Sequence, residues 1–235
     1  MGKVNTAVNI GLEGRNVTIE IDGLDTVARA LGNLQGKSPA AVKAAVNQTA
    51  RQARKLMIAA AKARYVVNTA GVRHLKDLKQ TGKATNTNLA AKLFISKMRN
   101  DLGYFENDPT QAYTGGDVFR HSPSFYKARV LASSSLKPLP GKGNLSKGFL
   151  MEFKSGHIGM VQRIIGSSSG RTRTEKSGAP RWQNGDGKVE KLQTMGAPSA
   201  TAMHAQVWPE VRDDVELYLM ARIQDRVDWI LARYR

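Results

Sequence analysis

Apolar residues recur at helical spacing from Ser38 to Val67, which predicts one long amphipathic helix. Ser38 can cap the first turn as a hydrogen-bond acceptor, and Pro39 suits the first helical position, where no amide hydrogen is needed. Alanines make this face shallow, so that a sheet or another helix can approach it closely. The predicted stripe consists of Val42, Val46, Thr49, Ala53, Leu56, Met57, Ala60 and Ala63.

A second helical pattern runs from Pro209 to Tyr234, after a short helical turn predicted over 198–205. Acidic residues in its early turns and arginines at its end complement the helix dipole. These charged residues are Asp213, Asp214 and Glu216 at the start, and Arg233 and Arg235 at the end. The apolar stripe consists of Val211, Val215, Tyr218, Leu219, Ile223, Val227, Ile230, Leu231 and Tyr234.

Alternating apolar and polar residues predict the strands. The single strands are 16–21, 89–98, 127–132 and 189–195. The clearest pattern is a β-hairpin over 146–164, in which Ser155 and Gly156 form a tight turn. Its apolar faces consist of Phe149, Met151 and Phe153 on the first strand, and Ile158, Met160 and Gln162 on the second.

Two short helices are also predicted. One spans 24–34 and is closed by Gly36, and the other spans 69–80, with Asn68 as its cap and Gly82 as its stop.

The predicted elements add up to an α+β fold of a single domain, 1–235. We expect a long amphipathic helix packed on a mostly antiparallel sheet, with a C-terminal long helix and an extended basic loop. The stretch 99–121 is rich in turn residues and is expected to cross a surface.

The basic loop, 166–188, has no apolar periodicity and is rich in glycine and serine, which is typical of a flexible arm. Two interpretations of its function stay open. Its side chains suit binding to phosphate with stacking on a base, and they also suit docking on a neighbouring subunit. Docking is favoured, because an arm with one aromatic anchor fits a protein interface. The residues concerned are Arg171, Arg173, Lys176, Arg181 and Trp182.

The chain has a formal net charge of +17, from 36 Lys and Arg against 19 Asp and Glu. Such a surplus attracts phosphates or acidic protein surfaces. The basic residues are spread along the chain rather than gathered in one tail, so charge alone does not select between DNA and an acidic protein ring. One basic face of the long helix consists of Arg51, Arg54, Lys55 and Lys62.

No motif for catalysis or ligand binding stands out. The absence of cysteine excludes disulfides and thiolate metal sites, and the four histidines lie far apart in the sequence. No phosphate-binding loop or G-x-S-x-G motif occurs. No apolar run reaches membrane-spanning length, and the first residues lack the apolar core of a signal peptide. We therefore expect a soluble, non-enzymatic protein without cofactor or metal, made in the cytoplasm.

Three stretches carry a family resemblance: the hairpin SKGFLMEFKSGHIGMVQR, the segment YVVNTAGVRHLKDL, and the C-terminal GAPSATAMHAQVWPEVRDDVELYLMARIQDRVDWIL. Together they resemble the prophage minor tail protein Z family, the tail-completion proteins of long-tailed bacteriophages. The resemblance covers most of 17–231 but little of 166–188. Its most specific part is the turn Lys154, Ser155, Gly156 and His157, with Gly159, Met160 and Val161 beyond it.

The resemblance implies a structural virion protein at the head-proximal end of a phage tail, assembled in the host bacterial cytoplasm. Such a protein completes the tail tube and helps it join the head, without catalytic residues or a membrane. Related proteins form rings, commonly hexameric. The implied partners are other copies of the chain, adjacent tail-terminator, tail-tube or head-connector proteins, and the phage DNA end.

The hairpin turn, the basic helix face and the loop 166–188 are the candidate contact surfaces. The alternative is a sequence-independent nucleic-acid-binding protein, which the surplus of positive charge also suits.

Overall fold

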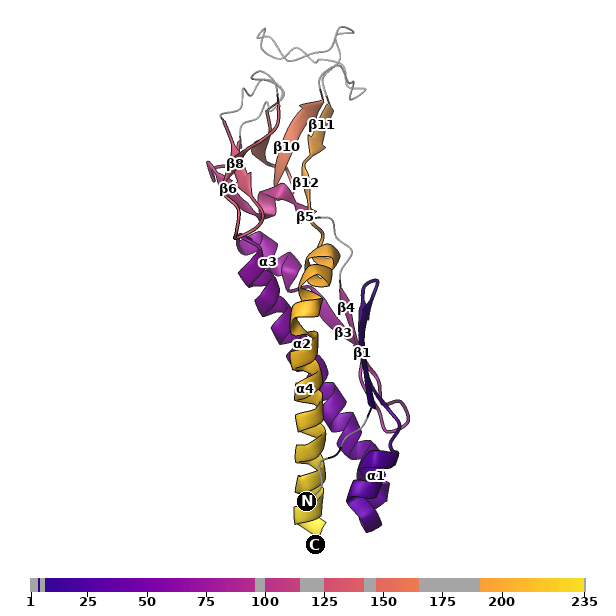
Figure 1. Ribbon diagram of the computed structural model, residues 1–235. Coiled ribbons are helices and arrows are strands. Elements are labelled where there is room, and N and C mark those ends of the chain that lie inside the picture. Colours follow the sequence, from indigo (N-terminus) through magenta and orange to yellow (C-terminus); the bar gives the residue numbers. More distant parts are fainter. Residues whose placement is uncertain are drawn as a thin grey trace, which may run out of the picture. The chain divides into compact units, whose positions relative to one another are not determined.

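The computed structural model describes residues 4, 7–95, 100–114, 125–141, 147–164 and 191–234. The chain forms two compact units, whose elements are labelled in Figure 1. Unit 1 comprises Met1–Lys62, His74–Met98 and Ser199–Arg235, and unit 2 comprises Ala63–Arg73 and Arg99–Pro198. The prediction of a single domain, 1–235, did not distinguish these units.

Unit 1 contains a four-stranded antiparallel sheet in the order β1-β2-β4-β3. Its strands are β1 (Ala7–Glu13), β2 (Asn16–Asp22), β3 (Leu78–Gly82) and β4 (Ala91–Ile95). The strand predicted over 16–21 is confirmed, and that over 89–98 is confirmed in a shorter form. β1 was not predicted, although Val8, Ile10 and Leu12 alternate with other residues along it.

Helix α2 (Ser38–Arg64) has 27 residues and confirms the predicted long helix, although it ends before Val67. Its buried face belongs to one apolar core together with residues of β1, β2, β4 and α4. Ala63 is exposed, so the apolar stripe ends earlier than predicted. The buried residues are Ser38, Ala41, Val42, Ala45, Val46, Thr49, Ala50, Ala53, Met57 and Ala61.

Two short helices, α1 (Asp25–Leu31) and the 3-10 helix η1 (Gly32–Lys37), precede α2. The prediction that Gly36 closes the first helix is wrong, because Gly32 ends α1 with a positive φ of 53°. The prediction that Ser38 caps α2 as an acceptor is also wrong. The chain is already helical through η1, and the Ser38 hydroxyl donates to the carbonyl of Gln35.

Helix α4 (Ala200–Tyr234) is one element of 35 residues and confirms the predicted C-terminal helix. The predicted start at Pro209 is wrong, because the helix begins at Ala200 and includes most of the turn predicted over 198–205. Ser199 caps α4, because the amide of Ala202 donates to its Oγ at 3.1 Å. With α2 and the antiparallel sheets, this C-terminal helix confirms the α+β fold.

Pro209 lies inside α4, where it cannot donate a backbone hydrogen bond. Val207 and Trp208 beside it are buried, and this packing offsets the lost bond. Asp213 and Asp214 therefore lie in the middle of the helix and do not complement the dipole at its start, as was predicted.

The predicted cap of the next short helix is confirmed, because the amide of Gly71 donates to Oδ1 of Asn68 at 3.0 Å. This helix, α3 (Thr69–Leu75), is shorter than predicted. Leu78 is fully buried but belongs to β3, and Gly82 ends that strand rather than a helix.

Unit 2 contains small antiparallel sheets with the strand orders β11-β10-β9, β6-β7-β8 and β12-β5. The elements are β5 (Asn100–Asp101), the 3-10 helix η2 (Leu102–Tyr104), β6 (Glu106–Asp108), β7 (Lys127–Arg129), β8 (Lys137–Pro138), β9 (Phe149–Glu152), β10 (Ile158–Ile164), β11 (Lys191–Thr194) and β12 (Gly196–Ala197). β7 confirms a shorter form of the strand predicted over 127–132, and β11 confirms the strand predicted over 189–195 except at Met195, while 189–190 lie outside the described residues.

The interior of unit 2 includes a segment that was expected at the surface. Gly103, Tyr104 and Phe105 are buried, so the prediction that 99–121 crosses a surface is wrong for its described part. Side chains of β9 and β10 form the core beside Tyr126: Phe149, Leu150, Met151, Met160 and Val161.

Two leucines of α4 test the packing of unit 1. Leu219 is fully buried, whereas Leu217, two residues away, is 69% exposed. We expect Leu219→Ala to lower the free energy of unfolding by about 2 to 5 kcal/mol, because it leaves a cavity in the core. Leu217→Ala is the matched control and should change it by less than about 0.5 kcal/mol. Chemical denaturation measures both; equal effects would contradict the packing described.

Candidate functional site

The predicted hairpin is confirmed as β9 and β10, which pair antiparallel with Glu152 opposite Ile158. Its turn is longer than the predicted tight pair. The amide of Phe153 donates to the carbonyl of His157 at 2.7 Å, and the amide of Gly156 donates to the carbonyl of Phe153 at 2.8 Å. Gly156 has a φ of 76°, a conformation that favours glycine.

The tip of this hairpin is exposed while its strands are buried. Lys154, Ser155 and Gly156 are exposed at the tip, and His157 is half-buried. We use the name hairpin tip for these four residues, which are the predicted interface turn. The exposed residues of this turn are therefore accessible to a partner.

The two predicted apolar faces of the hairpin are only partly confirmed. Ile158 was predicted to face inward but is 43% exposed, whereas Gly159 and Val161 are buried with Met160. Strict alternation fails because both faces of β10 are covered. Met160 and Val161 point to opposite faces, yet both belong to the core of unit 2, and η2 packs against the strand.

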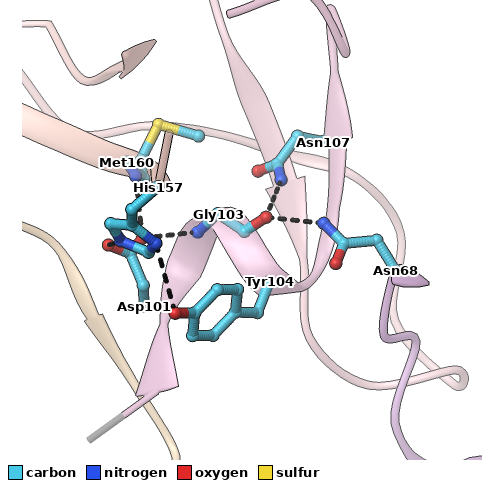
Figure 2. Close-up of polar contacts among 7 residues, drawn as sticks. All are labelled: Asn68, Asp101, Gly103, Tyr104, Asn107, His157 and Met160. Carbon is cyan, nitrogen blue, oxygen red and sulfur yellow. Dashed lines mark hydrogen bonds and ion pairs between the residues drawn. The ribbon is translucent and has the colours of Figure 1, made fainter. Parts of the chain in front are cut away.

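A buried carboxylate joins η2 to the hairpin (Figure 2). Oδ1 of Asp101 accepts hydrogen bonds from the amides of Gly103 and Met160, both at 2.7 Å. The first bond closes the η2 turn, and the second crosses to β10. Hydrogen bonds to a charged acceptor are stronger than neutral ones, so Asp101 fixes two distant segments of the chain together.

His157 extends this contact to the hairpin tip. Its Nε2 lies 3.6 Å from Oδ2 of Asp101, and its Nδ1 lies 3.4 Å from the hydroxyl of Tyr104. The ring also stacks on Phe153, with centroids 5.4 Å apart and planes inclined by 22°. The tip is thus held by one polar network and by ring contacts of His157 with Phe153 and Tyr104. We call Asp101, Tyr104 and His157 the polar anchor.

Two glycines allow the segments around the polar anchor to approach. An added Cβ at Gly159 would lie 2.5 Å from Oδ2 of Asp101, and one at Gly103 would lie 3.0 Å from the amide nitrogen of Met160. A side chain at either position would therefore force the two segments apart.

Two asparagine side chains also fix the η2 turn, by donating to its carbonyl groups. Nδ2 of Asn68 donates to the carbonyl of Gly103 at 2.6 Å, and Nδ2 of Asn107 donates to that of Phe105 at 2.7 Å. Figure 2 shows both amides pointing at the turn. These bonds satisfy buried carbonyl groups that would otherwise be costly.

The polar anchor places a carboxylate, an imidazole and a hydroxyl in the same order as a catalytic triad. Burial raises the pKa of Tyr104, and the charge of Asp101 raises it further. The phenol therefore keeps its proton at neutral pH. The contacts of the three residues hold the hairpin tip.

The predicted basic helix face is exposed along α2, but its members differ in their contacts. Nε of Arg54 donates to the carbonyl of Leu78 at 2.6 Å, and its Nη2 donates to that of Lys76 at 3.1 Å. Arg54 therefore ties α2 to the start of β3. The remaining members, Arg51, Lys55 and Lys62, repeat at spacings of four and seven and form a basic stripe.

The predicted contacts in the basic loop lie outside the described residues, so they stay predictions. They are Arg171, Arg173, Lys176, Arg181 and Trp182.

Sequence reasoning missed the residues that position the hairpin tip. Asp101 and Asn107 lie in a stretch that looked like surface turns, because a polar residue gives no periodic signal when it is buried by tertiary contacts. The available signal in the sequence was the clustering of polar and aromatic residues within a few positions of Gly103.

Within the described ranges, no group of three acidic, histidine or cysteine residues could hold a metal ion. No helix among those residues is long and apolar enough to cross a membrane. No protein-family model, curated protein or solved structure matches the chain.

Substitution of Asp101 tests the polar anchor. We expect Asp101→Ala to destabilise unit 2 by about 2 to 4 kcal/mol, because two charge-assisted hydrogen bonds are lost. Asp101→Asn keeps an oxygen acceptor and should cost clearly less. Hydrogen exchange at the amides of Gly103 and Met160 measures the effect directly. Unchanged exchange in the alanine variant would show that Asp101 does not hold these segments.

His204 in unit 1 predicts a pH dependence of stability. It is fully buried, and its Nε2 lies 2.9 Å from the carbonyl of Leu75. Burial lowers its pKa from 6.5, and the bond to Leu75 opposes this only in part. As the pH falls through 6.5, the unfolded chain therefore takes up the proton first, and stability is lost.

The matched variant is His204→Gln, which keeps a side-chain donor but does not titrate. We expect the wild type to lose stability relative to this variant between pH 7 and 5, measured by thermal unfolding across the pH range. Parallel pH profiles of the two proteins would refute the role of His204.

Proposed function

We propose that this chain is a structural subunit of a phage tail, which forms a ring at the head-proximal end and helps the tail join the head. The observation that carries the proposal is the hairpin. Its sequence contains the most specific part of the family resemblance, and its exposed hairpin tip is held from inside by the polar anchor.

A pre-ordered tip is useful for assembly because binding then costs little ordering entropy. Lys154 and Ser155 are exposed at the tip, and Ile158 beside them exposes 43% of its surface. A basic side chain next to an exposed apolar one suits a protein contact that charge steers and apolar burial holds. Other copies of the chain and adjacent tail-terminator, tail-tube or head-connector proteins are the proposed partners.

The polar anchor supports a non-enzymatic role. One carboxylate oxygen of Asp101 accepts from two backbone amides and so ties η2 to β10. The contacts of the polar anchor are therefore explained by its role in holding the hairpin tip.

Sequence-independent binding to nucleic acid is the second candidate. The basic stripe of Arg51, Lys55 and Lys62 favours it, together with the net charge of +17. In a tail ring the same stripe would suit the phage DNA end or an acidic rim of a neighbouring ring.

Two isoleucines at opposite ends of β10 test the assembly role. Ile158→Asp places a charge beside the hairpin tip, whereas Ile164→Asp changes a residue of similar exposure, 40% against 43%, away from the tip. We expect both proteins to fold, and only Ile158→Asp to abolish ring formation and the joining of tails to heads. Electron microscopy of tails assembled in cells that express each variant measures this.

A ring at the head-proximal tail end with the wild type, lost only with Ile158→Asp, supports the proposal. Absence of the protein from particles would oppose it. If the free protein then binds duplex DNA with a steep salt dependence, and R51E/K55E/K62E removes that binding, the second candidate replaces it.

A further inference from the structure

The sheet of unit 1 separates its charges by strand. The only charged residues in β1 and β2 are Glu13, Glu20 and Asp22, and those in β3 and β4 are Lys79 and Lys92. The acidic half contrasts with the strong positive charge of the whole chain.

The strand register places these charges on the outward face of the sheet. Val17 and Ile19 of β2 are fully buried, so the alternate residues, including Glu20, point away from the core. Glu20 is paired with Asn9 of β1, whose Nδ2 donates to Oε1 of Glu20 at 2.6 Å. This bond holds the Glu20 carboxylate toward the β1 edge. We call Glu13, Glu20 and Asp22 the acidic row.

β1 is an outer strand of this sheet, and within Ala7–Glu13 it has none of the sequence devices that usually protect an edge (Figure 1). Its seven residues pair with β2 in unbroken register, and it contains no lysine, proline or bulge. Among the described strands, β2 is its only partner. An edge of this kind presents unpaired amides and carbonyls that can pair with another strand.

The opposite edge, β3, is protected. Its register shifts between Gln80 and Gly82, it carries Lys79, and the carbonyl of Leu78 accepts from Arg54. Bulges and lysines are common devices against strand pairing. The difference between the two edges makes β1 the available one.

The inward side chains of β1 also suit an added strand. Ile10 is buried, but Val8 and Leu12 on either side are only partly buried against the core. Apolar residues at alternate positions of a new strand would cover them, and the residues between would lie on the outward face, as the acidic row does.

We propose that the β1 edge binds an extended, basic segment of a neighbouring polypeptide as a fifth strand. Lysine or arginine at alternate positions of that segment lies on the outward face, across from Glu13 and one strand away from Glu20 and Asp22. Its apolar residues cover Val8 and Leu12. This inference rests on the proposed function, because a neighbouring polypeptide is expected only if the chain is part of an assembly. It adds which surface is used and which residue types the neighbour contributes.

The peptide acetyl-Lys-Val-Lys-Val-Lys-Val-Lys-amide is the probe, and its glutamate counterpart is the control. The whole protein repels the basic peptide and attracts the acidic one, so binding of the basic peptide reports a local acidic site. We expect it to slow hydrogen exchange in β1 of the full chain, and the acidic peptide to leave β1 unchanged.

Charge-reversal variants locate the binding. E13K/D22K should weaken the affinity for the basic peptide by about tenfold or more, because the direct cross-strand attraction to Glu13 and the longer-range attraction to Asp22 both become repulsive. The matched control K92E changes the other half of the same sheet and should keep or increase the affinity. Glu20 is left intact because of its bond to Asn9. Fluorescence anisotropy of a labelled peptide measures both affinities.

Three outcomes would overturn the inference. The first is that the basic peptide does not protect β1 from hydrogen exchange, and the second is that E13K/D22K binds the peptide as tightly as the wild type. The third is that β1 is protected without peptide in a self-associated protein, because a second copy would then be the occupant. Failure here leaves the ring test with Ile158→Asp unaffected, because that test concerns unit 2 and assembled tails. Absence of the protein from tails would likewise leave the peptide result standing.

Discussion

Close packing against an alanine-rich helix face is the constraint on which unit 1 depends. The small side chains at the centre of α2 let the sheet and α4 share one core with it. Larger side chains there would hold these elements apart and typically cost about 1 to 3 kcal/mol each. The alanines concerned are Ala41, Ala45, Ala50, Ala53 and Ala61. The acidic row and the open β1 edge are held in place by this core.

Unit 2 depends on polar contacts to a greater degree. The carboxylate of Asp101 is buried, which would be costly without partners, but its two amide donors come from segments far apart in the sequence. Through His157 the same carboxylate reaches the hairpin tip. A contact surface can thus be ordered before binding, and this order is the property that links the fold to the proposed assembly role.

Periodicity predicted the elements whose burial is one-sided. The helix of α2, the strand β2 and the alternation of Ala91, Leu93 and Ile95 in β4 follow from their spacing. Predictions failed where tertiary packing overrode a local signal. Pro209 was taken as a helix start, and Ser38 as a cap, because each residue type favours that position when its neighbours are ignored.

The sequence by itself determined the α+β class, both long helices, the hairpin and the surplus of positive charge, because each depends on local spacing or on composition. Only the tertiary structure decided which polar residues are buried together. Asp101 contacts His157 and Met160, and Asn68 contacts Gly103, through contacts between distant segments that no local pattern records. The acidic row is also a tertiary property, since the pairing of β1 with β2 places Glu13 and Glu20 on one face of the same hairpin in a strongly basic protein.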